Sequence, residues 1–156
     1  MTSIPTISPR IVEALYCEAL VLSDEVRAAF TLPARPQRAA APGVEDPARV
    51  ALSSEGLRTT TRLMHAITWL LNHRAYFRGE IADLQLRRQG RLSPEIRRPD
   101  PHHVALLAAE TRLLVDATQR FYDRLLRLDA AWRLTASAGQ DPIQGLRERI
   151  AGRLAG

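Results

Sequence analysis

A helix start signal that recurs at long intervals is the feature that most constrains this chain. A side-chain acceptor stands directly before a proline at Ser8-Pro9, at Asp46-Pro47 and at Asp100-Pro101. Ser and Asp accept hydrogen bonds from the free N–H groups of a first helical turn, and proline suits the first helical position, which needs no N–H. The three signals therefore predict helices over about 8–30, 47–78 and 100–133.

Apolar residues recur every three or four positions within these segments, whereas the alternation typical of a strand is absent. The seam of the first segment consists of Ile11, Leu15, Ala19, Leu22, Val26 and Phe30. Residues 31–46 are rich in proline and predict a linker. The sequence thus predicts an all-α fold, an antiparallel three-helix bundle of long helices over residues 8–134.

Both ends of the chain are expected to lie outside this bundle. Residues 1–7 are expected to form a short disordered lead. Residues 135–156 predict a flexible tail in which Asp141-Pro142 repeats the start signal of a short amphipathic helix. The apolar residues of this tail are the candidate contacts of a ligand that binds in a groove of a partner: Ile143, Leu146, Ile150 and Leu154.

The chain contains no apolar run near the ~20 residues that a membrane-spanning helix needs. Its first residues, Met1-Thr2-Ser3-Ile4-Pro5, lack the basic flank and apolar stretch of a signal peptide. We therefore expect a cytoplasmic protein that does not associate with a membrane. Cys17 is the single cysteine, so neither an internal disulfide nor a cysteine-based zinc cluster is expected.

The formal net charge is +5, and all 22 basic residues are arginine. The excess is concentrated in residues 74–98, where seven arginines stand against three acidic residues. A nucleic-acid-binding protein more often spreads its basic residues along one face that reads a groove. A nucleic-acid-associated regulator that uses the basic 74–98 segment is therefore the alternative, not the leading expectation.

The segment over 47–78 carries the candidate partner-binding residues. Leu57, Met64 and Leu71 share one direction on a helical wheel, and the wide apolar arc around them is expected to face the other helices or a second subunit. The opposite stripe is polar except for a tryptophan, and the candidates on and beside it are Arg58, Arg62, His65, Trp69, Asn72 and Arg74. Arginine beside tryptophan is typical of an interface anchor. The alternative is that the linker or the third helix covers Trp69.

Cys17 and Leu20 point away from the apolar seam of the first helix. A free cysteine is usually buried, so an outward Cys17 beside Leu20 indicates a second packing surface. These two residues are the candidate dimer contacts, because a homodimer is the simplest arrangement that covers them.

No motif in the sequence predicts catalysis. The four histidines lack the spacing of a metal site, and neither a phosphate-cradling loop nor a nucleophile with a nearby base is found. We therefore expect a protein without enzymatic activity, with no catalytic, cofactor-binding or metal-binding residues and no cofactor.

One stretch of the central helix has a recognisable pattern. It comprises Glu55-Gly56-Leu57-Arg58-Thr59-Thr60-Thr61-Arg62-Leu63-Met64, then Thr68-Trp69-Leu70-Leu71-Asn72-His73-Arg74-Ala75, and finally Gly79-Glu80. This pattern resembles the RcdA-like family of small alphaproteobacterial helical proteins, regulators of CtrA degradation that are often described only as a domain of unknown function. The likeness departs from the family at Gly56, Thr59, Thr68 and His73.

The resemblance implies a three-helix-bundle dimer without enzymatic activity. RcdA-like proteins act as adaptors for the ClpXP protease, because they bind the primed unfoldase and carry cargo in a cascade that clears cell-cycle regulators. The implied partners are the protease unfoldase or its accessory factors, together with the cargo regulators. A helical dimer with another scaffold role is a further alternative.

Overall fold

The computed structural model describes residues 7–31, 43, 46–96 and 98–138. Within these ranges the chain forms helices and no strand, which confirms the all-α fold class. The described helices are α1 (Pro9–Ala29), α2 (Pro47–Phe77), α3 (Asp83–Gln89), α4 (Pro101–Ala105) and α5 (Ala109–Ala138). None of these helices is both long and apolar enough to cross a membrane.

Each of the three start signals opens a helix. The side chains of Ser8, Asp46 and Asp100 each accept a hydrogen bond from a backbone N–H two or three residues further on. The backbone N–H of His102 lies 2.9 Å from Asp100 Oδ1, and this bond holds the pKa of that carboxyl below its ordinary value. The predicted helix starts are therefore correct to within a residue.

The third predicted helix, over 100–133, is in fact two helices. α4 ends at Ala105, and α5 begins at Ala109 and continues to Ala138. Between them Leu107 turns inward and packs with Ala51 of α2 and Val115 of α5. Burial of an apolar side chain of this size contributes about 1.5–3 kcal/mol, which accounts for a break in a sequence that otherwise suits a helix.

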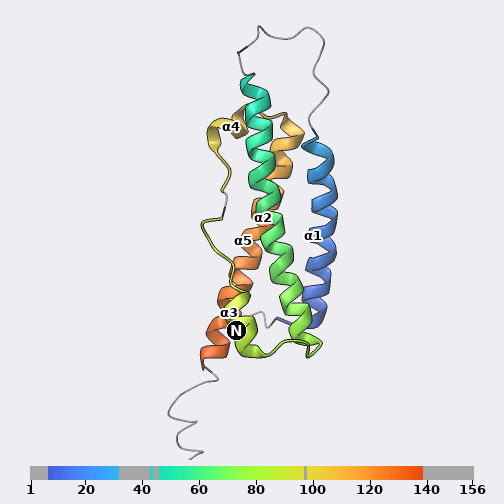
Figure 1. Cartoon of the computed structure of the whole chain (residues 1–156), viewed down its shortest axis with the longest axis vertical. Helices are drawn as coiled ribbons and strands as arrows, with labels where there is room; N and C mark the ends of the chain where they lie inside the picture. The colour runs from blue at the N-terminus through green and yellow to red at the C-terminus, as the bar shows by residue number, and fades with distance from the viewer. Residues whose placement is uncertain (1–6, 32–42, 44–45, 97, 139–156) are drawn as a thin grey trace, which may run out of the picture.

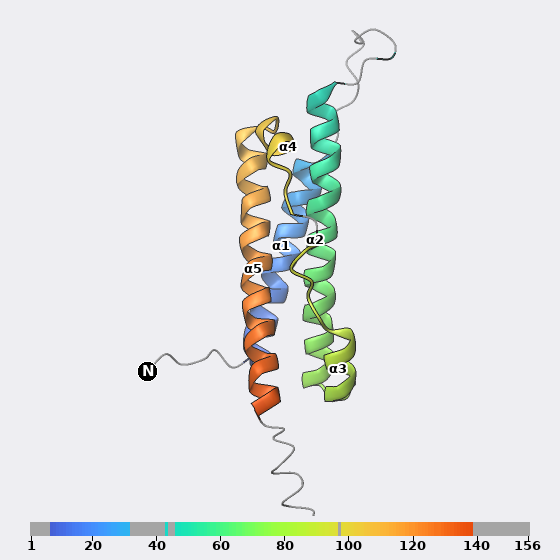
Figure 2. The ribbon, with the colours of Figure 1, turned by 90° about the vertical axis from the view of Figure 1, so that its left-hand side faces the viewer.

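The three long helices lie side by side, but their directions do not simply alternate (Figure 1 and Figure 2). α1 runs opposite to α2, whereas α2 and α5 run in the same direction. Two hydrogen bonds fix this relation, because Arg62 reaches Thr118 and, further along both helices, Trp69 reaches Asp129. The predicted antiparallel arrangement is therefore wrong for α2 and α5.

The parallel arrangement follows from the return segment, residues 90–96 and 98–100, which leads back along α2 after α3 (Figure 2). Gly79, at φ +73°, turns the chain just after α2, in a conformation that glycine adopts without strain. The return segment is then held by buried Leu92 and by Tyr122, whose hydroxyl donates to the Ser93 carbonyl at 2.9 Å. Because the chain has returned to the far end before α4, α5 begins beside the start of α2.

The core lies between the three long helices. Its buried apolar residues include Val12, Leu15, Ala19 and Val26 of α1, Leu63, Ala66, Trp69 and Leu70 of α2, and Phe121, Tyr122 and Leu125 of α5. The predicted seam of α1 is correct at Leu15, Ala19 and Val26, whereas Ile11 is exposed and Val12 is buried in its place. On a helical wheel the four buried residues lie within about 60° of one another, so the buried face of α1 differs from the predicted seam mainly at its first position.

Several predicted features lie outside the described residues. They are residues 1–6 of the lead, nearly all of the linker, and the tail beyond residue 138. The tail candidates Ile143, Leu146, Ile150 and Leu154 belong to this group. The predicted lead is wrong at Ile7, which is buried in the core, and the predicted tail is wrong over 135–138, which continue α5.

Candidate protein-interaction surface

The polar stripe of α2 faces inward. Arg62 and Trp69, the central residues of the predicted partner surface, are 0% and 2% exposed. The prediction that they anchor an exposed surface is therefore wrong for the folded chain, and the alternative in which the third long helix covers Trp69 is correct. α5 supplies this cover, because each of the two side chains donates a hydrogen bond to it.

Trp69 is held against α5 by its indole nitrogen and by its ring. Nε1 donates to Asp129 Oδ1 at 3.0 Å, and Asp129 also accepts from Arg133 Nε at 3.0 Å. The ring of His73 stacks on the indole with centroids 3.8 Å apart, and its Nδ1 lies 3.0 Å from the Trp69 carbonyl oxygen. Burial lowers the pKa of His73, so the imidazole is neutral at neutral pH. This polar cluster fixes how α2 sits against α5.

Arg62 lies at the same contact between α2 and α5, about two turns before Trp69. Its Nη2 donates to Thr118 Oγ1 at 3.0 Å and to Thr59 Oγ1 at 3.5 Å. Burial lowers the pKa of Arg62, and the negative charges of Glu55 and Asp123 partly oppose that effect. A guanidinium keeps its proton in proteins, so Arg62 is a buried cation that the interior of this chain accommodates.

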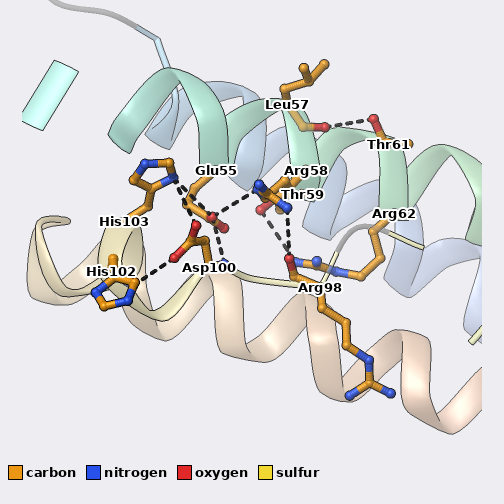
Figure 3. A network of polar contacts seen from close by, with 10 residues as sticks. All are labelled: Glu55, Leu57, Arg58, Thr59, Thr61, Arg62, Arg98, Asp100, His102 and His103. Atoms are coloured by element: carbon orange, nitrogen blue, oxygen red, sulfur yellow. Dashed lines mark hydrogen bonds and ion pairs between the residues drawn. The ribbon is translucent and has the colours of Figure 1, made fainter. Parts of the chain in front are cut away.

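Glu55 lies at the centre of a polar network that joins α2 to the return segment and α4 (Figure 3). Its Oε1 accepts from the Asp100 N–H at 2.9 Å and lies 3.4 Å from Arg58 Nε and 4.0 Å from His103 Nδ1. Arg58 Nη1 in turn donates to the Arg98 carbonyl at 3.4 Å. Arg58, a predicted partner contact, is thus engaged within the chain and only partly exposed.

Part of the apolar arc of α2 is turned outward. Val50, Leu57, Met64 and Leu71 stand seven residues apart and form what we call the apolar stripe, with exposed fractions of 39%, 62%, 63% and 43%. The predicted arc is therefore divided. Leu63 and Leu70 face the other helices of the same chain, whereas the stripe does not, and a second subunit over the stripe stays a prediction. Val50 is not among the predicted residues, although the seven-residue spacing extends to it. That spacing keeps side chains on one side of a helix and is the repeat by which helices pair.

The helix surface beside the stripe is uncharged. Between Val50 and Leu71, all of which the structure describes, the charged residues are Glu55, Arg58 and Arg62, and they belong to the inward contacts above. The outward positions next to the stripe are Ser53, Thr60, Thr61 and Thr68. Solvent-facing helix surfaces normally carry charge, whereas the centres of protein interfaces are depleted of it. The outward face of α2 therefore has the composition of an interface.

A groove of about 560 Å³ lies between α1 and α2, next to the apolar stripe. Its apolar floor includes Val26, Phe30, Leu52, Leu63 and Ile67, and its rims include Ser23, Arg27, Leu57, Thr60 and Met64. Gly56 lets the two helices approach here, because a Cβ at this position would lie 2.9 Å from the ring of Phe30. Stripe and groove form one apolar surface over α1 and α2.

The remaining candidates of α2 belong neither to the stripe nor to the groove. His65 is exposed, and Asn72 is half-buried. Arg74 Nε donates to Glu13 Oε1 at 2.7 Å, and the guanidinium lies 4.3 Å from the centroid of the Tyr16 ring. The hydrogen bond to Glu13 raises the pKa of Arg74. Arg74 thus connects α2 to α1 within the chain.

Cys17 and Leu20 are exposed on α1, as expected from the sequence. Leu20 precedes the groove residue Ser23 by three positions, so it continues the apolar surface along α1.

The basic 74–98 segment does not present its arginines as one uninterrupted charged face. Arg74 pairs with Glu13, and Arg87 Nε pairs with Asp83 Oδ2 at 2.6 Å. Arg78, Arg88 and Arg91 are exposed. Among the described residues, no group of three or more His, Cys, Asp or Glu side chains is arranged to hold a metal ion.

Comparison with known proteins identifies the family of the chain. A family model matches residues 4–154, which is nearly the whole sequence. No curated protein and no solved structure matches it. The chain therefore belongs to the DUF1465 family, which is described as proteins of unknown function.

Proposed function

We propose that this protein is a non-enzymatic adaptor, a cytoplasmic homodimer that binds protein partners through the apolar surface of α1 and α2. The observation that supports the proposal is the exposure of the apolar stripe of α2. Arg62 and Trp69 are used inside the chain, while the stripe and its uncharged neighbours lie outside. An exposed apolar patch with polar edges is typical of a surface that another protein covers.

The most exposed apolar residues lie where a specific interface would have its centre. A few residues near the centre of an interface contribute most of the binding energy. Leu57 and Met64 are the most exposed residues of the stripe and lie at its middle. Leu20 and Val21, both exposed on α1, extend the apolar surface beyond them.

The resemblance to RcdA-like proteins supports a particular kind of adaptor. Thr60, Met64 and Leu71 lie on the exposed face of α2, and they match the family pattern together with the buried residues Arg62 and Trp69. We therefore propose that the protein delivers cell-cycle regulators to the ClpXP protease. The partners would be the unfoldase or its accessory factors on one side and the cargo regulators on the other.

The test is affinity capture from lysate with the full-length chain and two variants. Met64→Asp places a charge in the middle of the stripe, and His65→Asp places the same charge one residue away. The proposal expects the wild type and His65→Asp to enrich the unfoldase, its accessory factors or short-lived regulators, and Met64→Asp to lose them. The half-lives of the captured regulators should then lengthen in cells that lack the protein.

Two results would contradict the proposal, the first its surface and the second its adaptor role. One is equal capture by both variants, which would place the binding surface elsewhere. The other is enrichment of nucleic acid that disappears steeply with salt, which would favour the regulator that uses the basic 74–98 segment.

A further inference from the structure

The groove between α1 and α2 has the form of a helix-binding site. Its α2 wall runs from Leu52 to Ile67, about 22 Å at a rise of ~1.5 Å per residue. Its floor is apolar, and its one charged rim residue, Arg27, is paired with Asp24 at 2.9 Å. An apolar floor with a single charged residue at its rims fits the apolar face of an amphipathic helix.

The chain itself contains a segment that matches this groove. Residues 141–154 begin with the start signal Asp141-Pro142 and place Ile143, Leu146, Ile150 and Leu154 at helical spacing. A helix from Ile143 to Leu154 would measure about 16 Å, which is shorter than the groove. A single short helix of this kind gains its stability from apolar surface supplied by a neighbour.

The segment cannot reach the groove of its own chain as a helix. α5 ends at the same end of the molecule as α2 (Figure 1), and five residues from Ala138 to Ile143 span at most about 18 Å. Ile67, the nearest groove residue on α2, lies about 15 Å along the axis from Phe77. The groove also opens away from α5, which adds about 15 Å sideways, one interaxial distance and a helix radius. The two components of about 15 Å combine to a straight path of about 21 Å, which exceeds the reach of about 18 Å. The chain would also have to go around a helix, which lengthens the path.

We propose that residues 141–154 of a second copy of the chain bind in the groove as a helix. A two-fold axis perpendicular to the long helices would place the end of α5 in one copy beside the first half of α2 in the other copy. Each tail would then meet the groove of the partner. Ile143, Leu146, Ile150 and Leu154 would then face the groove floor. The proposal rests on the homodimer of the proposed function but not on its adaptor role.

Disulfide trapping between two full-length variants tests the proposal. Both carry Cys17→Ser; one adds Thr60→Cys on the exposed groove rim, and the other adds Arg147→Cys beside the apolar face of the tail. An affinity tag on the second variant separates mixed pairs from like pairs by mass. Mild oxidation of the mixture should give mainly the mixed disulfide. Replacing Thr60→Cys by Glu25→Cys, on an exposed part of α1 outside the groove, should lower the yield about tenfold.

The tail itself supplies a matched pair of control variants. Ile150→Asp should lower the yield of mixed disulfide about tenfold, whereas Gln144→Asp, which adds the same charge off the apolar face, should leave it unchanged. Three results would overturn the proposal. They are an intrachain disulfide in a chain that carries both Thr60→Cys and Arg147→Cys, an equal yield of mixed disulfide with Glu25→Cys, and a yield of mixed disulfide that Ile150→Asp leaves unchanged. Light scattering on the same samples separates the two hypotheses. A dimer without the mixed disulfide would contradict only the tail contact, and a monomer would also contradict the proposed homodimer.

Discussion

The indole of Trp69 donates a hydrogen bond to the carboxylate of Asp129, with 3.0 Å between Nε1 and Oδ1. The two residues are sixty positions apart in the sequence. The second oxygen of that carboxylate accepts from Arg133 on its own helix. The bulkiest side chain of α2 is therefore bound to a fully engaged acceptor on α5. Its role is to hold two parallel helices together, and the outward face of α2 is left to other residues.

Trp69→Phe should lower the free energy of unfolding by about 1.5–3 kcal/mol, the usual contribution of a hydrogen bond to a charged group. Trp69→Ala should lower it by about 3–5 kcal/mol, because a cavity is added. Guanidinium chloride denaturation followed by far-UV circular dichroism measures both. Trp132→Phe, at a partly buried position of α5, is the control and should have a smaller effect. A Trp69→Phe variant as stable as the wild type would show that the hydrogen bond contributes nothing.

Leu20→Asp should dissociate the homodimer while leaving the fold of each chain intact and the apolar stripe free for partners. The Leu20 side chain is exposed, so the change removes little of the packing within the chain. We expect a dissociation constant at least about tenfold higher, which corresponds to roughly 1.4 kcal/mol. Light scattering at micromolar concentration should show the wild type and His65→Asp as dimers. If the wild type scatters as a 17.4 kDa monomer, the homodimer does not exist.

Stability should fall as the pH drops from about 7 to 5, because His73 is buried in its neutral form. Burial lowers its pKa below 6.5, and the charged groups that face it are Asp129 and Arg133. Between the two pKa values the unfolded chain binds the proton more readily than the folded chain, so protonation favours unfolding. Asp100, whose pKa is also lowered, contributes only in the separate range below 3.8.

Denaturation at several pH values checks this dependence through its slope. His73→Phe keeps an aromatic ring against Trp69 and cannot titrate, so the slope between about pH 7 and 5 should flatten. His65→Gln, at an exposed position, should keep the wild-type slope. An unchanged slope in His73→Phe would assign the effect to another group.

Gly56→Ala should destabilise the protein although alanine favours helix. The new Cβ would lie 2.9 Å from the Phe30 ring and would push it toward the groove. The gain in helix propensity is about 1 kcal/mol, and overpacking costs about 1–3 kcal/mol, so we expect a net loss of about 1 kcal/mol. Urea denaturation measures it, with Ser53→Ala on the exposed rim as the control that changes propensity alone. A stabilised Gly56→Ala would mean that Phe30 does not pack there.

The starts of the long helices could be predicted because a cap depends on residues that are adjacent in sequence, as at Asp46-Pro47. The direction of α5 could not be predicted. It depends on the return segment, which is held by contacts such as Tyr122 to Ser93 and Asp100 to Glu55, 29 and 45 residues apart. Prolines and glycines mark that segment as irregular, but they carry no information about where it leads.

The two faces of α2 could also be separated from the sequence, but not assigned to the inside or the outside. A helical wheel places Arg62 and Trp69 opposite Met64 correctly. The hydrogen-bond acceptors of the two buried side chains are Thr118 and Asp129. Both lie on another helix, so the sequence around Arg62 and Trp69 does not indicate them. Hydrophobicity alone therefore predicts the wrong exposure for Arg62, because a buried polar network holds this side chain inside the chain.

The parallel path of α2 and α5 also determines what a nascent chain exposes. Arg62 and Thr118 are 56 residues apart, so this contact cannot form while α2 is leaving the ribosome. Synthesis of the residues between Phe77 and Ala138 takes roughly 3–12 s at usual rates of translation. During that interval α1 and α2 display apolar surface on both faces of α2, a state that invites chaperone binding or aggregation. The last long helix to be made is thus the one that commits the chain to its fold, and a chain truncated before α5 should be cleared rather than accumulate.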